Sequence, residues 1–512
     1  MWRIAMMSVS NKKVSLLAYL YMLIPITIFF LGWVKLPIAV IVSAILWIGF
    51  FSLYKTEIAP DHSRLELPVI PVLIAILGFL VWVILSGQCG LFYQTWDWHG
   101  RNAVFRDLIN YEWPVIFPET GNALNYYFIF WMVPALVGKL FGWGVASVVL
   151  LIWTYVGILL SFLLILRFLS ADSGKKVMTV FTVFVIWGGL HIIGLLFTNA
   201  IGWNNFFAGG GDGWLDGFCG DAYTYSYQYS SNNTLLDWVF NQTIVPWVAV
   251  PLFLNAPKIN TFAFIGLCTL PFSPLPFVGF FIILCVWAIP IVIKYIKDGK
   301  IKELMQQIFS IPNIAATLSI FPIFLLFFTS NSALSNAEAG GGFGLYVPLE
   351  AFGVKRIVLL ALFYLIEFGI YAVLIWKDHK RDYYYYMTIA ALIVIPLFKV
   401  GKGRDFCMRA SIPLMFLLMI WVLKFLIDNA KNSKYQMHII GLVVALTISS
   451  FNVISPMSGE MRRVRENGGP VLSDDLYTFS DKHIQDPCDT TDLINFIVED
   501  PEDAPFYKYI AR

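Results

Sequence analysis

Long apolar runs, many of them close to twenty residues, alternate with short polar segments along most of the chain. A helix of roughly 20 apolar residues crosses the hydrocarbon core of a bilayer. We expect about thirteen such helices, over residues 14–34, 36–54, 68–88, 145–167, 177–197, 235–255, 260–273, 275–295, 308–330, 354–376, 384–400, 410–428 and 437–456. The pattern predicts an all-α polytopic membrane protein with its transmembrane domain over residues 1–456.

The composition supports this class. Of 512 residues, 58% are hydrophobic and 13% are charged, whereas soluble domains carry about 25% charged residues. The formal net charge of +2 does not by itself indicate a partner, and we expect no nucleic-acid partner. The six cysteines have no metal-binding spacing. No soluble catalytic domain is attached, so any chemistry must use the loops and the helix ends.

The distribution of Lys and Arg predicts the membrane topology of the chain, that is, which loops lie on the cytoplasmic side. Residues 124–142 are apolar enough to span the membrane, but they could also lie flat on its surface. If they lie flat, most of the basic loops fall on one side, as expected for the cytoplasm. If they span, Lys175, Lys176 and the later basic loops move outside. We therefore expect a flat interfacial helix, with its aromatic residues at the interface.

This topology assigns each remaining segment to one face of the membrane. We expect a cytoplasmic N-terminus and long outer loops at 89–144, 198–234 and 331–353. The polar tail 457–512 is then a short outer-face segment, too short for a sizeable core of its own.

The first outer loop carries the densest polar cluster. A charged residue costs roughly 3 kcal/mol at a bilayer centre, so ionisable groups gather in loops or cavities. Five of them fall within eleven positions: Asp97, His99, Arg101, Arg106 and Asp107. Asp97 can act as a general base on a hydroxyl group, supported by the other four. Alternatively, it caps a helix that begins at Trp98, and the sequence leaves both possibilities open.

A second cluster lies at 399–409, where basic residues gather on the otherwise less basic outer face. Glycine backbone amides and a helix start favour an anion here, although the segment is not a P-loop. We expect Lys402, Arg404 and Arg409 to bind a phosphate. Snorkelling of these side chains to lipid head groups is the alternative.

The loop 198–234 is rich in Gly, Asn, Asp and Tyr. Aromatic faces beside hydrogen-bonding groups suit a carbohydrate, and we expect Asp221, Tyr225, Tyr229 and Asn232 to contact one. A lid without a ligand is equally compatible with this composition.

Two ionisable residues, His191 and Glu367, stand within predicted spans. Such residues suggest function by default. We find no charged partner for either in a nearby span, which argues against a proton relay, and we place neither in the reaction centre.

The pattern resembles the GT-C superfamily of membrane glycosyltransferases. The resemblance rests on Asp97 in the first long outer loop, on the flat segment 124–142, and on the span 145–167 followed by Arg167, Lys175 and Lys176. Short motifs such as Trp-Asp-Trp-His-Gly-Arg-Asn-Ala and Arg-Asp-Phe-Cys-Met-Arg-Ala-Ser-Ile-Pro are similar to those of uncharacterised bacterial polytopic proteins. The chain departs from well-known members by an extra helix pair before the loop and by the lack of a large outer domain.

The resemblance implies an inverting transfer of a sugar from a polyprenyl-phosphate-linked donor to a lipid or glycan acceptor. Asp97 would be the base and 399–409 the lipid-phosphate site, on the outer face of a bacterial inner membrane. We expect no cofactor; a divalent metal would require Asp97 and another acid to share it.

Other functions stay open. A transporter or flippase of a lipid-linked sugar would be largely indifferent to Asp97→Asn, whereas an enzyme would lose turnover and keep donor binding. An O-antigen polymerase or ligase would also use basic outer loops. A structural partner in an envelope complex would tolerate changes at both Asp97 and Arg409.

Overall fold

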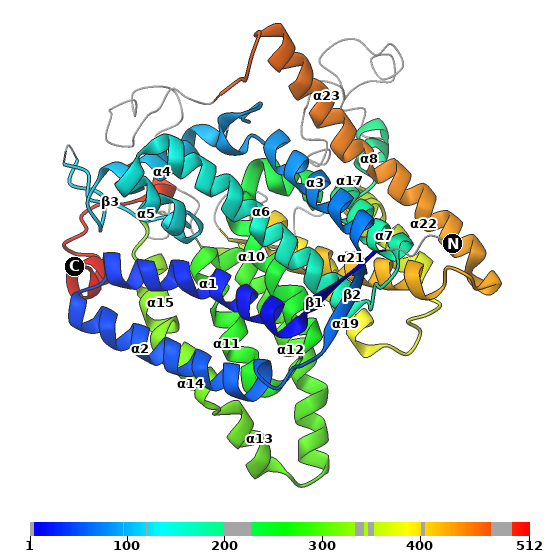
Figure 1. Ribbon diagram of the computed structural model, residues 1–512, viewed down its shortest axis with the longest axis horizontal. Coiled ribbons are helices and arrows are strands. Elements are labelled where there is room, and N and C mark those ends of the chain that lie inside the picture. Colours follow the sequence, from blue (N-terminus) through cyan, green and yellow to red (C-terminus); the bar gives the residue numbers. More distant parts are fainter. Residues whose placement is uncertain are drawn as a thin grey trace.

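The structure is a computed structural model that describes residues 5–95, 97–118, 120–197, 227–332, 342–346, 353–400, 405–472 and 494–512. Figure 1 shows a bundle of helices with a few very short strands. Among the described residues, nine helical segments are long and apolar enough to cross a membrane: Asn11–Trp33, Leu36–Ile58, Trp143–Phe168, Gly174–Leu196, Pro274–Lys297, Ile311–Thr329, Val354–Ile375, Asp405–Asp428 and Ser433–Glu466. The predicted all-α polytopic class is confirmed, with nine supported spans in the described part rather than the expected thirteen.

The remaining expected spans coincide with helices that these criteria do not include. Three of them are shorter apolar helices, Val69–Leu85, Ile259–Phe272 and Tyr383–Leu397. The fourth, expected at 235–255, is the helix α10 described below.

The helices follow one another along the whole chain, and their bounds define the labels used below. They are α1 (Asn11–Trp33), α2 (Leu36–Leu53), α3 (Val69–Leu85), α4 (Trp98–Asn110), α5 (Met132–Phe141), α6 (Trp143–Phe168), α7 (Gly174–Ile186), α8 (His191–Phe197), α10 (Asn232–Asn255), α11 (Phe262–Leu267), α12 (Pro274–Lys297), α13 (Ile301–Ile308), α14 (Ile311–Ser319), α15 (Phe321–Thr329), α17 (Val354–Tyr364), α18 (Ile370–Ile375), α19 (Tyr383–Val394), α20 (Asp405–Ala410), α21 (Ile412–Asp428), α22 (Gln436–Ser449) and α23 (Phe451–Glu466).

Six short strands form three antiparallel pairs in the described residues. They are β1 (Met6–Ser10) with β2 (Arg64–Pro68), β3 (Ala123–Leu124) with β6 (Ile497–Val498), and β4 (Phe343–Leu345) with β5 (Phe398–Val400). None is long enough to form a sheet layer, so packing between helices holds the bundle together.

Helix α10 is the most buried helix of the bundle. Twenty-two of its 24 residues are buried, including Asn233, Asp237 and Gln242. Its polar residues lower its hydropathy, which keeps it out of the set of candidate spans even though it packs along α6 and α21. An interior helix of this kind must satisfy its polar groups with protein partners, because neither water nor lipid can do so.

A run of prolines separates two helices in the middle of the chain. The expected break near Pro271 is present: a 3-10 turn over Leu270–Phe272 separates α11 from α12. Pro274 and Pro276 lie in the first turn of α12, where the missing N–H would have had no intrahelical partner. The proline run therefore separates the short helix α11 from the long helix α12.

Residues 124–142 do not form one long helix. They contain part of β3, a 3-10 turn over Ile129–Trp131, and α5, which has ten residues. Ten helical residues extend about 15 Å, half of the roughly 30 Å core of a bilayer. The segment is therefore one of the shorter apolar helices and not one of the nine candidate spans of the described part.

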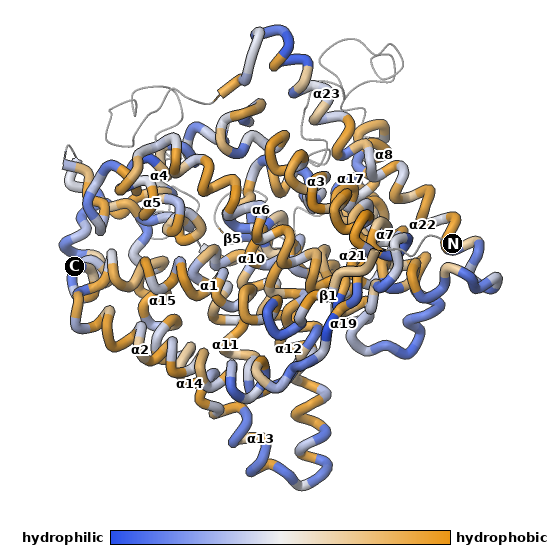
Figure 2. Tube along the Cα trace, viewed as in Figure 1, coloured by the Kyte–Doolittle hydropathy of each residue, from blue (hydrophilic) through white to orange (hydrophobic). Residues whose placement is uncertain are grey.

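The two ends of the bundle are built differently. At one end, the turn after α1 lies beside residues 494–512: the Lys35 N–H donates to the Ile510 carbonyl at 2.9 Å, and β3 pairs with β6 (Figure 1). At the other end, Arg167 at the end of α6 binds Asp61 at 2.8 Å. Figure 2 shows polar positions gathered at such ends, as in α13 and the last turns of α23. The first loop and residues 494–512 thus share one end.

Candidate functional site

The first loop places Asp97 at the start of α4. Asp97 occupies the position before the helix, yet its side chain makes no capping bond to the helix backbone. Instead, Oδ2 binds Arg101 Nη2 at 3.0 Å, one turn later. The carboxylate is 33% exposed and the Arg101 side chain only 5%. The capping alternative is therefore not what the structure shows; Asp97 is held by a buried arginine and keeps an open side.

An equivalent pair is found in α20. Asp405 Oδ2 binds Arg409 Nη1 at 2.6 Å, with the same spacing of four residues. Arg409 is the more buried partner, at 15% exposure against 52% for Asp405. Side chains four residues apart on a helix lie on one face. In each pair, the aspartate therefore holds the guanidinium of an arginine one helical turn later.

Both pairs act on the same residue, Tyr126. This tyrosine is 8% exposed, and burial raises the pKa of its phenol. The charges of Arg101, Arg409, Asp97 and Asp405 all influence that pKa as well. Electrostatic influence decays with distance and solvent screening, so both pairs, which are distant from each other in the sequence, lie within electrostatic range of Tyr126. Sequence reasoning treated Tyr126 only as an interfacial aromatic.

Its neighbour Tyr127 belongs to the same site. Burial raises the pKa of Tyr127 to about 12, and Arg409 and Asp405 also act on it. The Tyr127 carbonyl accepts a hydrogen bond from Asn241 Nδ2 of α10 at 3.2 Å. The two aromatic rings lie 4.7 Å apart, and Phe496 is 4.4 Å from Tyr126. Three aromatic rings thus pack together within electrostatic range of the ion pairs.

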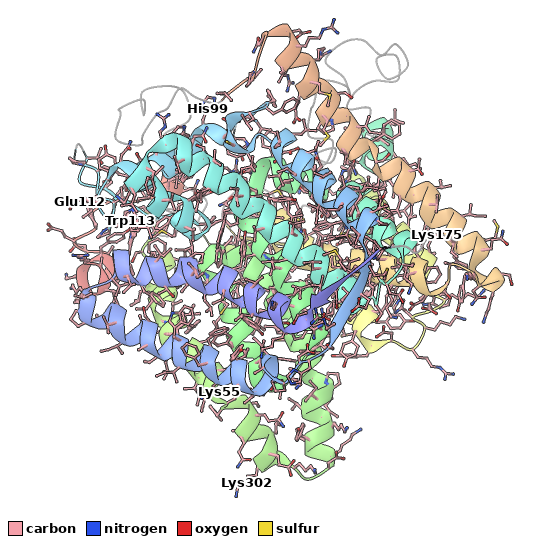
Figure 3. The ribbon with its side chains drawn as sticks, viewed as in Figure 1. Lys55, His99, Glu112, Trp113, Lys175 and Lys302 are labelled. Atoms are coloured by element: carbon pink, nitrogen blue, oxygen red, sulfur yellow. The ribbon has the colours of Figure 1, made fainter. Side chains whose placement is uncertain are left out.

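The arginines have donors to spare. Within the described part of the chain, the buried Nε and Nη1 of Arg101 and the buried Nε of Arg409 have no hydrogen-bond partner. The same is true of His99 Nδ1, in the first turn of α4 (Figure 3). A buried donor left without a partner costs roughly 1–3 kcal/mol, and an oxyanion with several acceptor atoms would satisfy several at once. The arrangement is chemically suited to bind a phosphate or carboxylate beside a carboxylate base.

The other supporting residues of the first loop face elsewhere. The guanidinium of Arg106 lies 4.5 Å from the ring centre of Trp143, at the start of α6. Asp107 is completely buried. A spacing of five residues from Arg101 turns Arg106 to another face of α4. Arg106 therefore attaches α4 to the start of α6, whereas Asp97 is the partly exposed member of its pair with Arg101.

The predicted sugar-binding loop is described only at its end. Tyr229 is fully buried, and its hydroxyl donates to the Leu392 carbonyl at 2.6 Å. Asn232 is 2% exposed, and its Nδ2 donates to the Phe184 carbonyl at 2.8 Å. Both side chains are engaged in helix packing. Asp221 and Tyr225, like Lys402 and Arg404 of the basic segment, lie outside the described residues.

His191 and Glu367, expected to lack charged partners, are partners of each other. His191 Nε2 and Glu367 Oε2 are 2.8 Å apart, and the two side chains are 1% and 0% exposed. His191 begins α8, and Glu367 lies in a π-helical turn over Leu365–Gly369. The expectation failed because the two residues are distant in sequence, and only the packing of α8 against this turn brings them together.

A further pair of buried acids was not anticipated. Asp237 of α10 and Glu460 of α23 are 3% and 4% exposed and lie within electrostatic range of each other. Asp237 Oδ2 accepts from Asn233 Nδ2 at 2.8 Å, and its carbonyl accepts from Trp98 Nε1 at 3.0 Å. Glu460 lies beyond the predicted boundary at 456, because α23 continues to Glu466. That boundary concealed the pairing from sequence reasoning.

No protein-family model, curated protein or solved structure matches the chain. The assignment of a function therefore depends on the geometry of the site. In the part of the chain that the structure describes, no three or more His, Cys, Asp and Glu side chains come together in a group that could hold a metal ion.

Proposed function

We propose that the protein is a GT-C-like membrane glycosyltransferase. It would transfer a sugar, with inversion, from a polyprenyl-phosphate-linked donor to an acceptor on the outer face of a bacterial inner membrane. The observation that carries the proposal is that the Asp97–Arg101 and Asp405–Arg409 pairs both lie within electrostatic range of Tyr126. This arrangement combines a carboxylate, which can take a proton, with arginine donors, which can stabilise a leaving phosphate.

The reaction assigns a distinct role to each pair. The acceptor hydroxyl oxygen attacks the anomeric carbon, and Asp97 accepts the hydroxyl proton. The bond from that carbon to the phosphate oxygen breaks, and its electron pair stays on the phosphate. The spare N–H groups of Arg409 and Arg101 stabilise that charge. Tyr126 and Tyr127 supply an aromatic wall beside the sugar.

The proposed orientation follows from the two ends of the bundle. The end with Arg167, Lys175 and Lys176 would face the cytoplasm, since basic residues favour that side. The N-terminus would lie there too. The first loop and residues 494–512, which share the opposite end, would then face outward, where the lipid-linked donor is presented.

The function can be tested in nanodiscs with a panel of polyprenyl-phosphate sugars and an envelope lipid extract. We expect release of polyprenyl phosphate with one donor, and loss of that release in Asp97→Asn while the donor still binds. Asp172→Asn is the matched control, because Asp172 forms the same four-residue pair with Lys176 at the other end. Equal release by wild type and Asp97→Asn would refute the role of Asp97. Release of a diphosphate carrier would indicate a polymerase or ligase instead.

A second candidate is a proton-coupled transporter of a lipid-linked sugar, favoured by the buried His191–Glu367 pair. Intramembrane ionisable pairs often mark proton pathways. A transporter would move labelled lipid across proteoliposomes in response to a pH gradient. Glu367→Gln would abolish that movement and Asp97→Asn would not. Movement without release of carrier would favour this second function over the first.

A further inference from the structure

A cavity of about 570 Å³ opens at the end of the bundle that holds the first loop. Charged residues Glu112, Lys139 and Arg512 and the ring of Trp113 line it. Its volume falls within the usual range of ligand sites, about 300–1,000 Å³. Figure 3 shows Glu112 and Trp113 together at one edge of the molecule. Helix α4 extends about 20 Å from Asp97 to this region, so the cavity is distinct from the surroundings of Asp97.

The aromatic side of the cavity is firmly held. Trp113 Nε1 donates to the Leu108 carbonyl at 2.8 Å, and the Trp113 ring lies 5.3 Å from that of Trp33. Gly32 makes this approach possible: a Cβ there would lie 2.5 Å from Trp113 Cε3. The Trp113 ring is therefore a fixed wall.

The charged residues that line the cavity come from three different segments of the chain. Lys139 Nζ donates to the carbonyls of Tyr111 and Ile109 at the end of α4, and it lies 5.1 Å from the centre of the Trp113 ring. The Glu112 carboxylate is within electrostatic range of Lys139. The Arg512 backbone N–H donates to the Trp33 carbonyl at 2.8 Å, which holds the backbone of this lining residue at the end of α1. One acid and two cations thus line a single space.

The surroundings of the cavity are apolar and exposed. Ile116, which lines the cavity, is 46% exposed, and Leu140 and Phe141, which directly follow the lining residue Lys139, are 72% and 67% exposed. Exposed apolar side chains next to Trp and Lys are typical of the level where lipid head groups meet the hydrocarbon core. A ligand with acyl chains could cover these side chains while its polar part enters the cavity.

We propose that this cavity binds the head group of a phospholipid that carries both a phosphate and a primary amine. Arg512 and Lys139 would bind the phosphate, and Glu112 would accept hydrogen bonds from the ammonium group. A purely anionic head group would meet the Glu112 carboxylate. A quaternary amine has no N–H to donate and would need an aromatic face, but Lys139 already lies over the Trp113 ring.

The test is lipid retention in native mass spectrometry after purification from equal amounts of phosphatidylethanolamine, phosphatidylcholine and phosphatidylglycerol. We expect selective retention of phosphatidylethanolamine by the wild type. Glu112→Gln should reduce that preference about tenfold, as expected for loss of one charged hydrogen bond. Arg512→Gln should weaken retention of all phosphate-bearing head groups. Glu303→Gln, an exposed acid on α13, is the control and should retain the wild-type preference.

Soluble phosphoethanolamine as a competitor separates a head-group site from a lipid site. Displacement only at high excess supports a lipid whose chains contribute to binding. Equal retention of all three lipids by the wild type, or an unchanged preference in a folded Glu112→Gln variant, would overturn the proposal. Thermal unfolding in the same detergent verifies that the variants fold. Because sugar transfer is not measured, the outcome is independent of the proposed function.

Discussion

Asp97 and Asp405 each hold an arginine four residues later, but neither pair is best understood as a source of stability. Partly exposed ion pairs of this kind contribute roughly 0–1 kcal/mol to folding. Their value lies in orientation: each aspartate occupies one nitrogen of the guanidinium and leaves other donors unused. At the residue scale, the site is a pair of pre-positioned arginines, each beside a partly exposed carboxylate.

Arg409→Ala should weaken binding of the polyprenyl-phosphate sugar by about 1.5–3 kcal/mol, the value of a hydrogen bond to a charged group. Donor binding in nanodiscs, measured by thermophoresis, tests this. Lys424→Ala provides the control, because Lys424 forms a comparable pair with Asp428 further along the same span. Unchanged affinity in Arg409→Ala would remove this residue from the phosphate site.

The sequence predicted part of this site for a clear reason. Asp97, Arg101 and Arg409 are recognisable because charges are rare in so apolar a chain. Tyr126 is not, because aromatic residues make up 17% of the sequence and any of them could face lipid. Only the packing of the first loop against α20 and residues 494–512 singles it out.

At the scale of elements, the π-helical turn over Leu365–Gly369 is where the interior departs from regular helix. Such turns often occur at functional positions. Here the turn places Glu367 against His191. Gly189, just before α8, leaves space for the pair because it has no side chain. Asn452 Nδ2 and Ser449 Oγ donate to the carbonyls of Gly189 and Gly188. Three separate helical segments therefore converge on one buried polar contact.

Gly189→Ala should destabilise the protein by about 1–3 kcal/mol, as for overpacking of a close-packed core. A Cβ at Gly189 would lie 2.2 Å from Glu367 Oε2 and 2.7 Å from His191 Nε2. Gly144→Ala is the matched control, since a Cβ there meets nothing within 4 Å. Thermal unfolding in detergent should show a lower midpoint for the first variant only. Equal midpoints would mean that the pair can move aside freely.

Helix α10 explains why hydropathy alone miscounts the spans. Several of its buried Asn and Gln side chains bond to distant segments; Gln242 Oε1, for example, accepts from Ser273 Oγ at 2.9 Å, just before α12. Such polar residues lower the mean hydropathy of a sequence window and so argue against a span. A local window does not contain the distant partners that satisfy them.

At the scale of the whole molecule, an ion pair joins three segments at the end opposite the candidate site. Asp61 binds Arg167 at 2.8 Å, and Arg167 also donates to Ser15 Oγ at 2.8 Å. Burial by itself would raise the pKa of Asp61, but hydrogen bonds from Ser63 and the charge of Arg167 outweigh it and lower the pKa below its usual 3.8. The loop after α2, the start of α1 and the end of α6 are joined there.

Because the pKa of Asp61 is lowered in the folded state, its charge stabilises the folded protein at neutral pH and not at low pH. The contribution of Asp61 is present above pH 4, and it is lost as the pH falls through the lowered pKa of the folded state. Asp61→Asn should therefore lower the unfolding midpoint at pH 7 and remove part of the fall below pH 4. Unfolding midpoints recorded between pH 3 and pH 7 test this. Parallel curves for variant and wild type would show that Asp61 does not contribute through its charge.

The pairing of β3 with β6 has a consequence for how the protein is made. The loop that carries Tyr126 is synthesised early, but its partner strand and Tyr507, whose hydroxyl donates to the Leu124 carbonyl at 2.6 Å, come from the last twenty residues of the sequence. A ribosome stalled before residue 494 would leave all nine supported spans available for insertion, while the loop stays unfastened. Because of the order of translation, the candidate site stays incomplete until the helices of the bundle have been inserted into the membrane.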